Sequence, residues 1–273
     1  MFLDADDCLV SADYESFVGA IDEKGLGLAI FMYTKCELSY PGYQDAESAV
    51  STAQYVSSNE LFQAMICGGC DRLIEHPQHY EFNSVWSRFY KRDVIEGVVE
   101  KLGDQLAPFP LGLRFSEDRL FNLEYLWQLS RGTVGFFPIC AYYWDVEKSG
   151  TCNRLSSLDV RSLFLFAEAA GKLKDKSVLA SSEEPLVVSR EFMEQLKRTI
   201  TMAKKDDEII SLWLSTFDSS WLRLHLRRFP SDCLGRMGEW RLAAGLLSHG
   251  YLRETFGIYR YLIEIKAFAK RLL

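Results

Sequence analysis

The sequence predicts a mixed α/β domain over residues 1–155 and an all-helical region over residues 156–273. In the first part, apolar runs of strand length alternate with segments of helical periodicity, whereas only helical periodicity follows residue 156. The charge changes at the same place, from 12 Lys/Arg against 23 Asp/Glu before it to 19 against 15 after it. An acidic first part and a more basic second part favour two regions with different roles.

Several elements of the first part follow from apolar spacing. Helices are expected over residues 13–24, 93–106 and 117–130, and strands over residues 28–33 and 133–144. Val85 begins a segment predicted as a short strand or turn that leads into the second helix. Ser116 is the expected N-cap of the third helix. Residues 36–80 are polar and weakly patterned, which predicts a loop with short helices.

Two linkers, residues 180–185 and 228–232, divide the helical region. Its last helix carries an apolar stripe, with basic side chains largely off it: Ile258, Leu262, Ile265, Ala269 and Leu272, against Arg260, Lys266, Lys270 and Arg271. A basic amphipathic helix is typical of proteins that bind an anionic membrane surface. Packing of the stripe on the α/β domain is the other interpretation.

Composition excludes several classes of protein. The chain has 273 residues, of which 48% are hydrophobic and 25% charged, as in globular proteins rather than disordered ones. A net charge of −7 argues against a general nucleic-acid binder. No apolar run approaches the ~18 residues of a membrane-spanning helix, and the acidic start is unlike a secretory signal. Seven irregularly spaced cysteines then predict reduced thiols and a cytoplasmic location.

Two groups of carboxylates are candidates for chemistry. The segment Asp4-Ala5-Asp6-Asp7 follows the apolar pair Phe2-Leu3, and Glu117-Asp118 opens a predicted helix. Hard divalent cations take oxygen ligands, so the first group suits Mg²⁺ or Mn²⁺. A solvated acidic turn or helix cap is the alternative for the first group. For the second, acids at a helix N-terminus are stabilised by the helix dipole without any catalytic reason.

Four segments, in this order, resemble the family 2 glycosyltransferases of the GT-A fold. Residues 2–9, Phe-Leu-Asp-Ala-Asp-Asp-Cys-Leu, look like that family's metal-binding DXD strand end. Residues 85–92, Val-Trp-Ser-Arg-Phe-Tyr-Lys-Arg, are similar to its acceptor-side tryptophan segment. Residues 115–122 resemble its Glu-Asp motif, and residues 141–154 its closing strand with the polar loop that follows. The resemblance covers residues 1–155, and the fold it implies is a partial GT-A domain followed by the helical region.

The resemblance implies inverting, metal-dependent transfer of a sugar from a nucleotide-sugar to a glycan or lipid-linked acceptor. Asp6 and Asp4 would bind Mn²⁺ or Mg²⁺, with Asp4 also near the donor ribose. Asp118 would be the base and Glu117 would contact the acceptor. Trp86 would stack on an acceptor sugar, although a large aromatic side chain is also a common core residue. Lys148 or Arg154 would close over the diphosphate, or would simply be solvated loop cations.

One departure from that family concerns the beginning of the domain. In the family the metal motif lies in mid-domain, after the strands that hold the nucleotide, whereas this sequence begins at the motif. Either a longer chain exists, or the domain is a remnant. From the resemblance, the expected function is that of a transferase in surface polysaccharide synthesis. The protein is expected to be peripheral on the inner face of the cytoplasmic membrane. The alternative is a non-catalytic partner subunit that binds a membrane or a complete transferase.

A possible zinc site lies outside the resemblance. Cys67 and Cys70 have zinc-ligand spacing and are followed by His76 and His79. The two histidines are only three positions apart and lie close to the cysteines, unlike common zinc fingers. Asp206-Asp207-Glu208 is interpreted as a charge cluster at a helix start.

Overall fold

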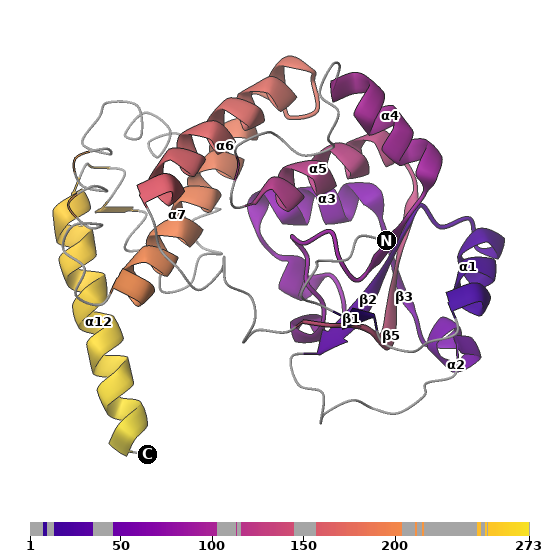
Figure 1. Ribbon diagram of the computed structural model, residues 1–273, viewed down its shortest axis with the longest axis horizontal. Helices are drawn as coiled ribbons and strands as arrows, with labels where there is room; N and C mark the ends of the chain where they lie inside the picture. The colour runs from indigo at the N-terminus through magenta and orange to yellow at the C-terminus, as the bar shows by residue number, and fades with distance from the viewer. Residues whose placement is uncertain are drawn as a thin grey trace. The chain divides into compact units, whose positions relative to one another are not determined.

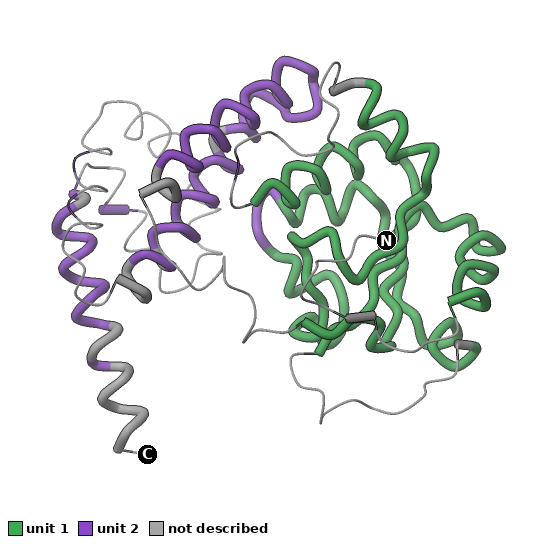
Figure 2. Tube along the Cα trace, viewed as in Figure 1, with its two compact units in different colours: residues 1–65, 69–111, 116–153 green, residues 66–68, 112–115, 154–273 purple. Residues whose placement is uncertain are grey.

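The structure, a computed structural model, describes residues 8–9, 14–34, 46–102, 113, 116–144, 157–203 and 251–272, with the single residues 211, 215, 245, 246 and 249. The chain forms two compact units (Figure 2). The first comprises residues 1–65, 69–111 and 116–153, and the second comprises residues 66–68, 112–115 and 154–273.

The first unit is built on a five-stranded mixed sheet (Figure 1). Its strands are β1 (Cys8–Leu9), β2 (Leu28–Thr34), β3 (Gln54–Ser57), β4 (Arg88–Tyr90) and β5 (Thr133–Tyr143). β5 pairs in parallel with β2, and β2 pairs antiparallel with β4. β3 and β1 pair antiparallel with the beginning and the end of β5, respectively. The most extensively paired strands, β2 and β5, are the two that the sequence predicted.

Helices cover both faces of this sheet (Figure 1). α1 (Tyr14–Glu23) and α2 (Ala46–Ser51) lie on one face, and α3 (Ser58–Cys67) and α5 (Glu117–Leu129) on the other. α4 (Arg92–Leu102) follows β4. The core under α1 consists of apolar side chains from α1, α2, β2, β5 and the turn between α1 and β2: Phe17, Ile21, Leu26, Ala29, Phe31, Ala49, Phe137, Ile139 and Ala141.

Replacing Phe17 tests this core against its immediate neighbour. Phe17 is 1% exposed and lies edge-on to Phe31 and Phe137, whereas Val18 is 47% exposed on the same helix. Phe17→Ala is expected to lower the free energy of unfolding by about 3–5 kcal/mol, because it leaves a cavity under α1. Val18→Ala should change it by less than about 0.5 kcal/mol. Urea unfolding followed by circular dichroism measures both, and equal effects would contradict the packing described.

The prediction of a loop with short helices over residues 36–80 missed one strand. The stretch contains short helices, the longest being the ten-residue α3, but it also contains β3. The helix begins with a reciprocal cap: the Glu60 amide donates to Ser57 Oγ at 3.2 Å, and Glu60 Oε2 accepts from the Ser57 amide at 2.8 Å. The hydrogen bonds that Glu60 Oε2 accepts from the amide and the hydroxyl of Ser57 hold the pKa of Glu60 below its usual value. This arrangement is a capping box, Ser-x-x-Glu, whose signal is present in the sequence.

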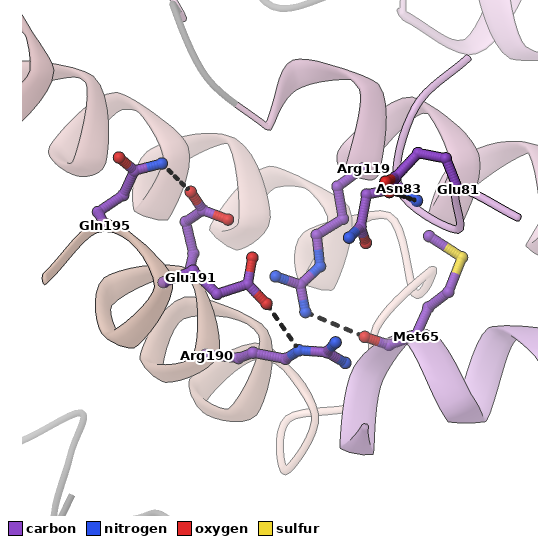
Figure 3. A network of polar contacts seen from close by, with 8 residues as sticks. Met65, Glu81, Asn83, Arg119, Arg190, Glu191 and Gln195 are labelled. Carbon is purple, nitrogen blue, oxygen red and sulfur yellow. Dashed lines mark hydrogen bonds and ion pairs between the residues drawn. The ribbon is translucent and has the colours of Figure 1, made fainter. Parts of the chain in front are cut away.

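The second unit is helical wherever the structure assigns regular elements to it. Beyond residues 66–68, these are α6 (Ser157–Asp175), α7 (Glu184–Ala203) and α12 (Leu252–Leu272), and α7 packs against both of the others. Ion pairs and hydrogen bonds one turn apart, such as Arg190 with Glu194 and Gln195 with Glu191, lie along α7 (Figure 3). Among the residues that the structure describes, no helix is long and apolar enough to cross a membrane.

Candidate active site

The parallel strands β2 and β5 end at the same edge of the sheet. The Trp144 amide, just past β5, donates to the carbonyl of Thr34 at 2.9 Å, which ties the two strand ends together. Cys8 lies opposite Tyr143, so the antiparallel strand β1 begins at this edge. In open α/β sheets, ligands bind at the carboxyl ends of the parallel strands. The edge formed by Thr34 and Tyr143 is therefore the place to look for a site.

Asp118 lies in the first turn of α5, and its side chain reaches the segment before β4. Its Oδ2 accepts a hydrogen bond from the Val85 amide at 3.2 Å, next to Trp86. Asp118 and Glu117 are both partly exposed. The structure thus bonds Asp118, the neighbour of Glu117, to the residue that precedes Trp86 in the chain. An ionised carboxylate has two acceptor oxygens and can accept from more than one donor.

Ser116 is the N-cap residue of α5, as the sequence predicted, but it does not cap the helix with its side chain. Its backbone is in the left-handed region, with φ of 60°, and its side chain makes no capping hydrogen bond. The carbonyl of Ser116 instead accepts from the amides of Arg119 and Leu120, at 3.1 and 3.3 Å. The first turn of α5 is therefore closed by main-chain hydrogen bonds. Its two acidic residues, Glu117 and Asp118, lie at the positive end of the helix dipole.

Residues 81–85, which precede Trp86, are held against the domain through their carbonyls. Asn122 donates to the carbonyls of Asn83 and Ser84 at 2.6 and 3.1 Å. Its own side-chain oxygen accepts from the Tyr90 hydroxyl at 2.8 Å. The Asn83 amide also bonds to Glu81 Oε1 at 3.0 Å (Figure 3). Sequence reasoning missed Asn122, which lies one helical turn after Asp118 and is 1% exposed.

Ser87 fixes the residue after Trp86 on strand β2. Its hydroxyl donates to the carbonyls of Phe31 and Met32 at 3.0 and 3.2 Å, and its carbonyl accepts from the Phe31 amide at 2.9 Å. Ser87 has a φ of 57°, a left-handed conformation that is costly for a non-glycine residue. These three bonds compensate for it. They lie where the register between β2 and β5 shifts, so Trp86 is placed by an irregular stretch of β2.

Arg88 is a fully buried cation close to this segment. Its exposed fraction is 0%, and Nη2 donates to the Glu81 carbonyl at 2.5 Å. Nε and Nη1 have no hydrogen-bond partner in the structure. Burial raises the pKa of the nearby Tyr90 hydroxyl; the charge of Asp118 adds to the rise and that of Arg88 opposes it. The phenol is thus held in its neutral, hydrogen-donating form beside the Asp118 segment.

A second buried arginine, Arg119, follows Asp118 and secures α5 from the other side. It is 0% exposed, and Nη2 donates to the Met65 carbonyl in α3 at 3.0 Å (Figure 3). Further along α5, the Tyr125 hydroxyl donates to the Gly27 carbonyl at 2.5 Å and accepts from the Lys91 amide at 2.8 Å. The helix that carries Asp118 is therefore bonded to α3, to the start of β2 and to the beginning of α4.

The remaining predicted site residues lie outside the described residues: Asp4, Asp6, Lys148 and Arg154. Asp206-Asp207-Glu208 does too. Within the described ranges, no group of three or more His, Cys, Asp and Glu side chains comes together as a metal site. Cys67, Cys70, His76 and His79 are all described, so the zinc interpretation is wrong. Neither Cys67 nor Cys70 forms a disulfide, and the centroids of the two imidazole rings are 6.3 Å apart.

Comparison with solved structures shows what this fold is similar to. The mixed α/β unit followed by helices agrees with the fold class that the sequence predicted. The chain is similar to S. aureus TarS residues 1–349 in complex with UDP-GlcNAc, with a TM-score of 0.53 and 14% identity, over 96% of this chain and 67% of that one. TarS 1–349 in complex with UDP gives a TM-score of 0.52 and 15% identity, over 96% and 66%. No protein-family model matches the sequence, and no curated protein matches it.

Proposed function

We propose that this chain is a nucleotide-sugar glycosyltransferase of family 2 that transfers a sugar to a hydroxyl group with inversion. The observation that carries the proposal is the position of Asp118, bonded to the Val85 amide next to Trp86 in a GT-A-type fold. The similar protein TarS binds UDP-GlcNAc, which supports a UDP-sugar as the donor. A glycan or lipid-linked acceptor and a role in surface polysaccharide synthesis belong to the same proposal.

Asp118 is the proposed base. Inverting transfer needs a group within hydrogen-bond reach of the acceptor hydroxyl, and that group takes its proton as the new bond forms. Asp118 is partly exposed, and its helix is secured by the Arg119 and Tyr125 hydrogen bonds, so its position is fixed before substrate binds. Glu117, in the same turn, is the proposed contact with the acceptor, and Trp86, which is only 6% exposed, is proposed to support the acceptor surface from behind.

The donor side of the proposal rests on Asp4, Asp6, Lys148 and Arg154. Carboxylates suit Mn²⁺ or Mg²⁺ in ligand type, and Cys8, two residues after Asp6, lies at the edge where β5 ends. A cation bound there would offset the negative charge of the departing diphosphate. Lys148 or Arg154 would add positive charge to the same group.

Measuring UDP release from UDP-GlcNAc by the purified full chain tests this proposal. Acceptors extracted from bacterial envelopes are supplied, with Mn²⁺ or with EDTA. Release that depends on both acceptor and cation is expected. Absence of release, together with absence of UDP binding by calorimetry, would overturn the transferase proposal and favour the partner-subunit alternative.

Helix α12 is the proposed membrane contact. Phe256 and Tyr259 are buried, whereas five large apolar or aromatic side chains stay between 38% and 65% exposed: Tyr251, Ile258, Tyr261, Leu262 and Ile265. All but Tyr251 lie within α12, which carries five Lys/Arg against two Glu. Exposed aromatic and aliphatic side chains on a basic helix suit the interface of an anionic bilayer.

Sedimentation with vesicles of phosphatidylglycerol and phosphatidylcholine measures this contact. The wild-type chain is expected to bind, and more weakly as salt rises. Leu262→Ser with Ile265→Ser should weaken binding by about tenfold or more, because apolar surface no longer enters the interface. Gly257→Ser is the matched control, since that exposed position has open space around it. Equal binding by all three proteins would remove the membrane contact from the proposal.

A further inference from the structure

Four aromatic side chains from three distant segments meet at the carboxyl edge of β2 and β5. Tyr33 comes from β2, Trp86 precedes β4, and Tyr142 and Trp144 come from the end of β5. The Trp86 ring is stacked on Tyr142, with centroids 4.6 Å apart and planes at 12°. Tyr33 meets Trp86 edge-on at 5.1 Å. The centroid of the Trp144 ring lies 6.0 Å from that of Trp86 and 6.3 Å from that of Tyr33.

Two of these rings belong to the interior and two reach the surface. Trp86 is 6% exposed and Tyr142 is 0% exposed, so the stacked pair is core. Tyr33 and Trp144 are partly exposed. The strand ends that carry them are tied by the bond from the Trp144 amide to the Thr34 carbonyl. The outer pair is therefore supported from behind by packed rings and along the backbone by the sheet.

One carboxylate, that of Glu81, lies within electrostatic reach of Tyr33, and a second, that of Asp118, is bonded to the chain neighbour of Trp86. Burial raises the pKa of the Tyr33 hydroxyl, and the negative charge of Glu81 raises it further, so Glu81 lies within electrostatic reach of that ring. Asp118 is bonded to Val85, the neighbour of Trp86 in the chain. A pyranose ring has an apolar C–H face and a rim of hydroxyls. Aromatic rings with a few nearby carboxylates match both, as in small-molecule sites generally.

We propose that Tyr33 and Trp144 form a platform for one hexopyranose ring of the acceptor, with Trp86 and Tyr142 as positioning residues behind it. This inference deepens the proposed function by naming the surface that binds the acceptor. It rests on that function, because only a transferase has an acceptor. The proton that Asp118 would take belongs to the acceptor, so the acceptor sugar must lie beside Asp118. The Trp86 segment, which Asp118 holds, brings the platform to that position.

Fluorine NMR of the full chain labelled with 5-fluorotryptophan tests the platform without any turnover. Chitotetraose, cellotetraose, maltotetraose and mannotetraose are the probes, and the Trp144 resonance is assigned by its loss in Trp144→Phe. At least one probe is expected to shift that resonance in a saturable way. If none of the four shifts it in the wild-type chain, the platform is overturned.

Variants then locate the bound sugar. Measured by calorimetry, which needs no Trp144 resonance, Tyr33→Ala and Trp144→Ala should raise the Kd for the bound probe by about tenfold or more, whereas Tyr33→Phe and Trp144→Phe should change it by less than about threefold. Tyr33→Leu and Trp144→Leu keep apolar volume without a ring, and the same loss is expected even if an alanine variant folds poorly. Trp127→Phe, at a partly exposed tryptophan of α5, is the matched control.

The outcomes separate this inference from the transferase proposal. Ring-dependent binding of a probe by a chain that releases no UDP would support the platform and contradict only the proposed reaction. Acceptor-dependent UDP release with an acceptor KM unchanged in Tyr33→Leu and Trp144→Leu would support the reaction and overturn the platform. An unchanged Kd for the probe in both leucine variants would also overturn it.

Discussion

Asp118→Asn is expected to lower the rate of acceptor-dependent UDP release by about 10²–10⁴-fold, the range that a positioned general base contributes. The asparagine side-chain oxygen can still accept the hydrogen bond from the Val85 amide, so the Trp86 segment should stay in place. What disappears is a group that can take a proton from the acceptor hydroxyl. The loss should therefore fall on kcat, with little change in the KM for UDP-GlcNAc.

Asp93→Asn is the matched control for this variant. Asp93 is also an acid in the first turn of a helix, α4, where its Oδ1 accepts from the Val94 amide at 3.0 Å. If acids at helix starts matter here only through the helix dipole, the two variants should behave alike and transfer should change less than about twofold in both. A rate for Asp118→Asn close to that of Asp93→Asn would contradict the assignment of the base, even if the chain proves to be a transferase.

The elements that the sequence predicted are those with strong local patterns. α1, β2, α5 and β5 all lie within one or two residues of their expected bounds. Apolar spacing determined each of them, because the buried face of a helix or strand is recorded in consecutive residues. Within residues 36–80, β3 was missed and α3 was expected only as one of several short helices without bounds, although α3 carries local signals as well. Ser57 and Glu60 form a capping box, and Leu61, Phe62, Met65 and Ile66 lie at helical spacing.

The candidate site was predictable in part. Glu117, Asp118 and Trp86 were singled out from sequence motifs, but their proximity depends on a contact between residues 33 positions apart. No local pattern encodes such a distance. The residues that support the site, Asn122 and Arg88, were missed for the same reason. Their side chains donate to backbone carbonyl groups of residues 81–84, and because every residue has a backbone carbonyl, the amino-acid sequence does not indicate which one is bonded. The partner of a polar side chain becomes known only when the chain is folded.

Asn122→Ala is expected to lower the free energy of unfolding by about 3 kcal/mol. Three buried or half-buried groups lose their partner at once: the Tyr90 hydroxyl and the carbonyls of Asn83 and Ser84. An unsatisfied buried polar group costs about 1–3 kcal/mol, and relaxation with entry of water recovers part of the total. Gln128→Ala is the control on the same helix, since Gln128 makes one bond of 3.3 Å to the Gly97 carbonyl and should cost less than about 1 kcal/mol.

Asn122→Asp distinguishes support of the site from bulk stability. The aspartate can still accept from the Tyr90 hydroxyl, but it can no longer donate to the carbonyls of Asn83 and Ser84, and its charge repels them. The Trp86 segment should then loosen against Asp118 while the packing of α5 is largely kept. Urea unfolding together with the rate of UDP release measures this: a rate lowered by about tenfold or more in fully folded protein is expected, because misplacing the acceptor surface relative to the base is costly to the reaction. Full activity in Asn122→Asp would mean that Trp86 is held without Asn122, and that Asp118 alone is sufficient to organise this edge of the sheet.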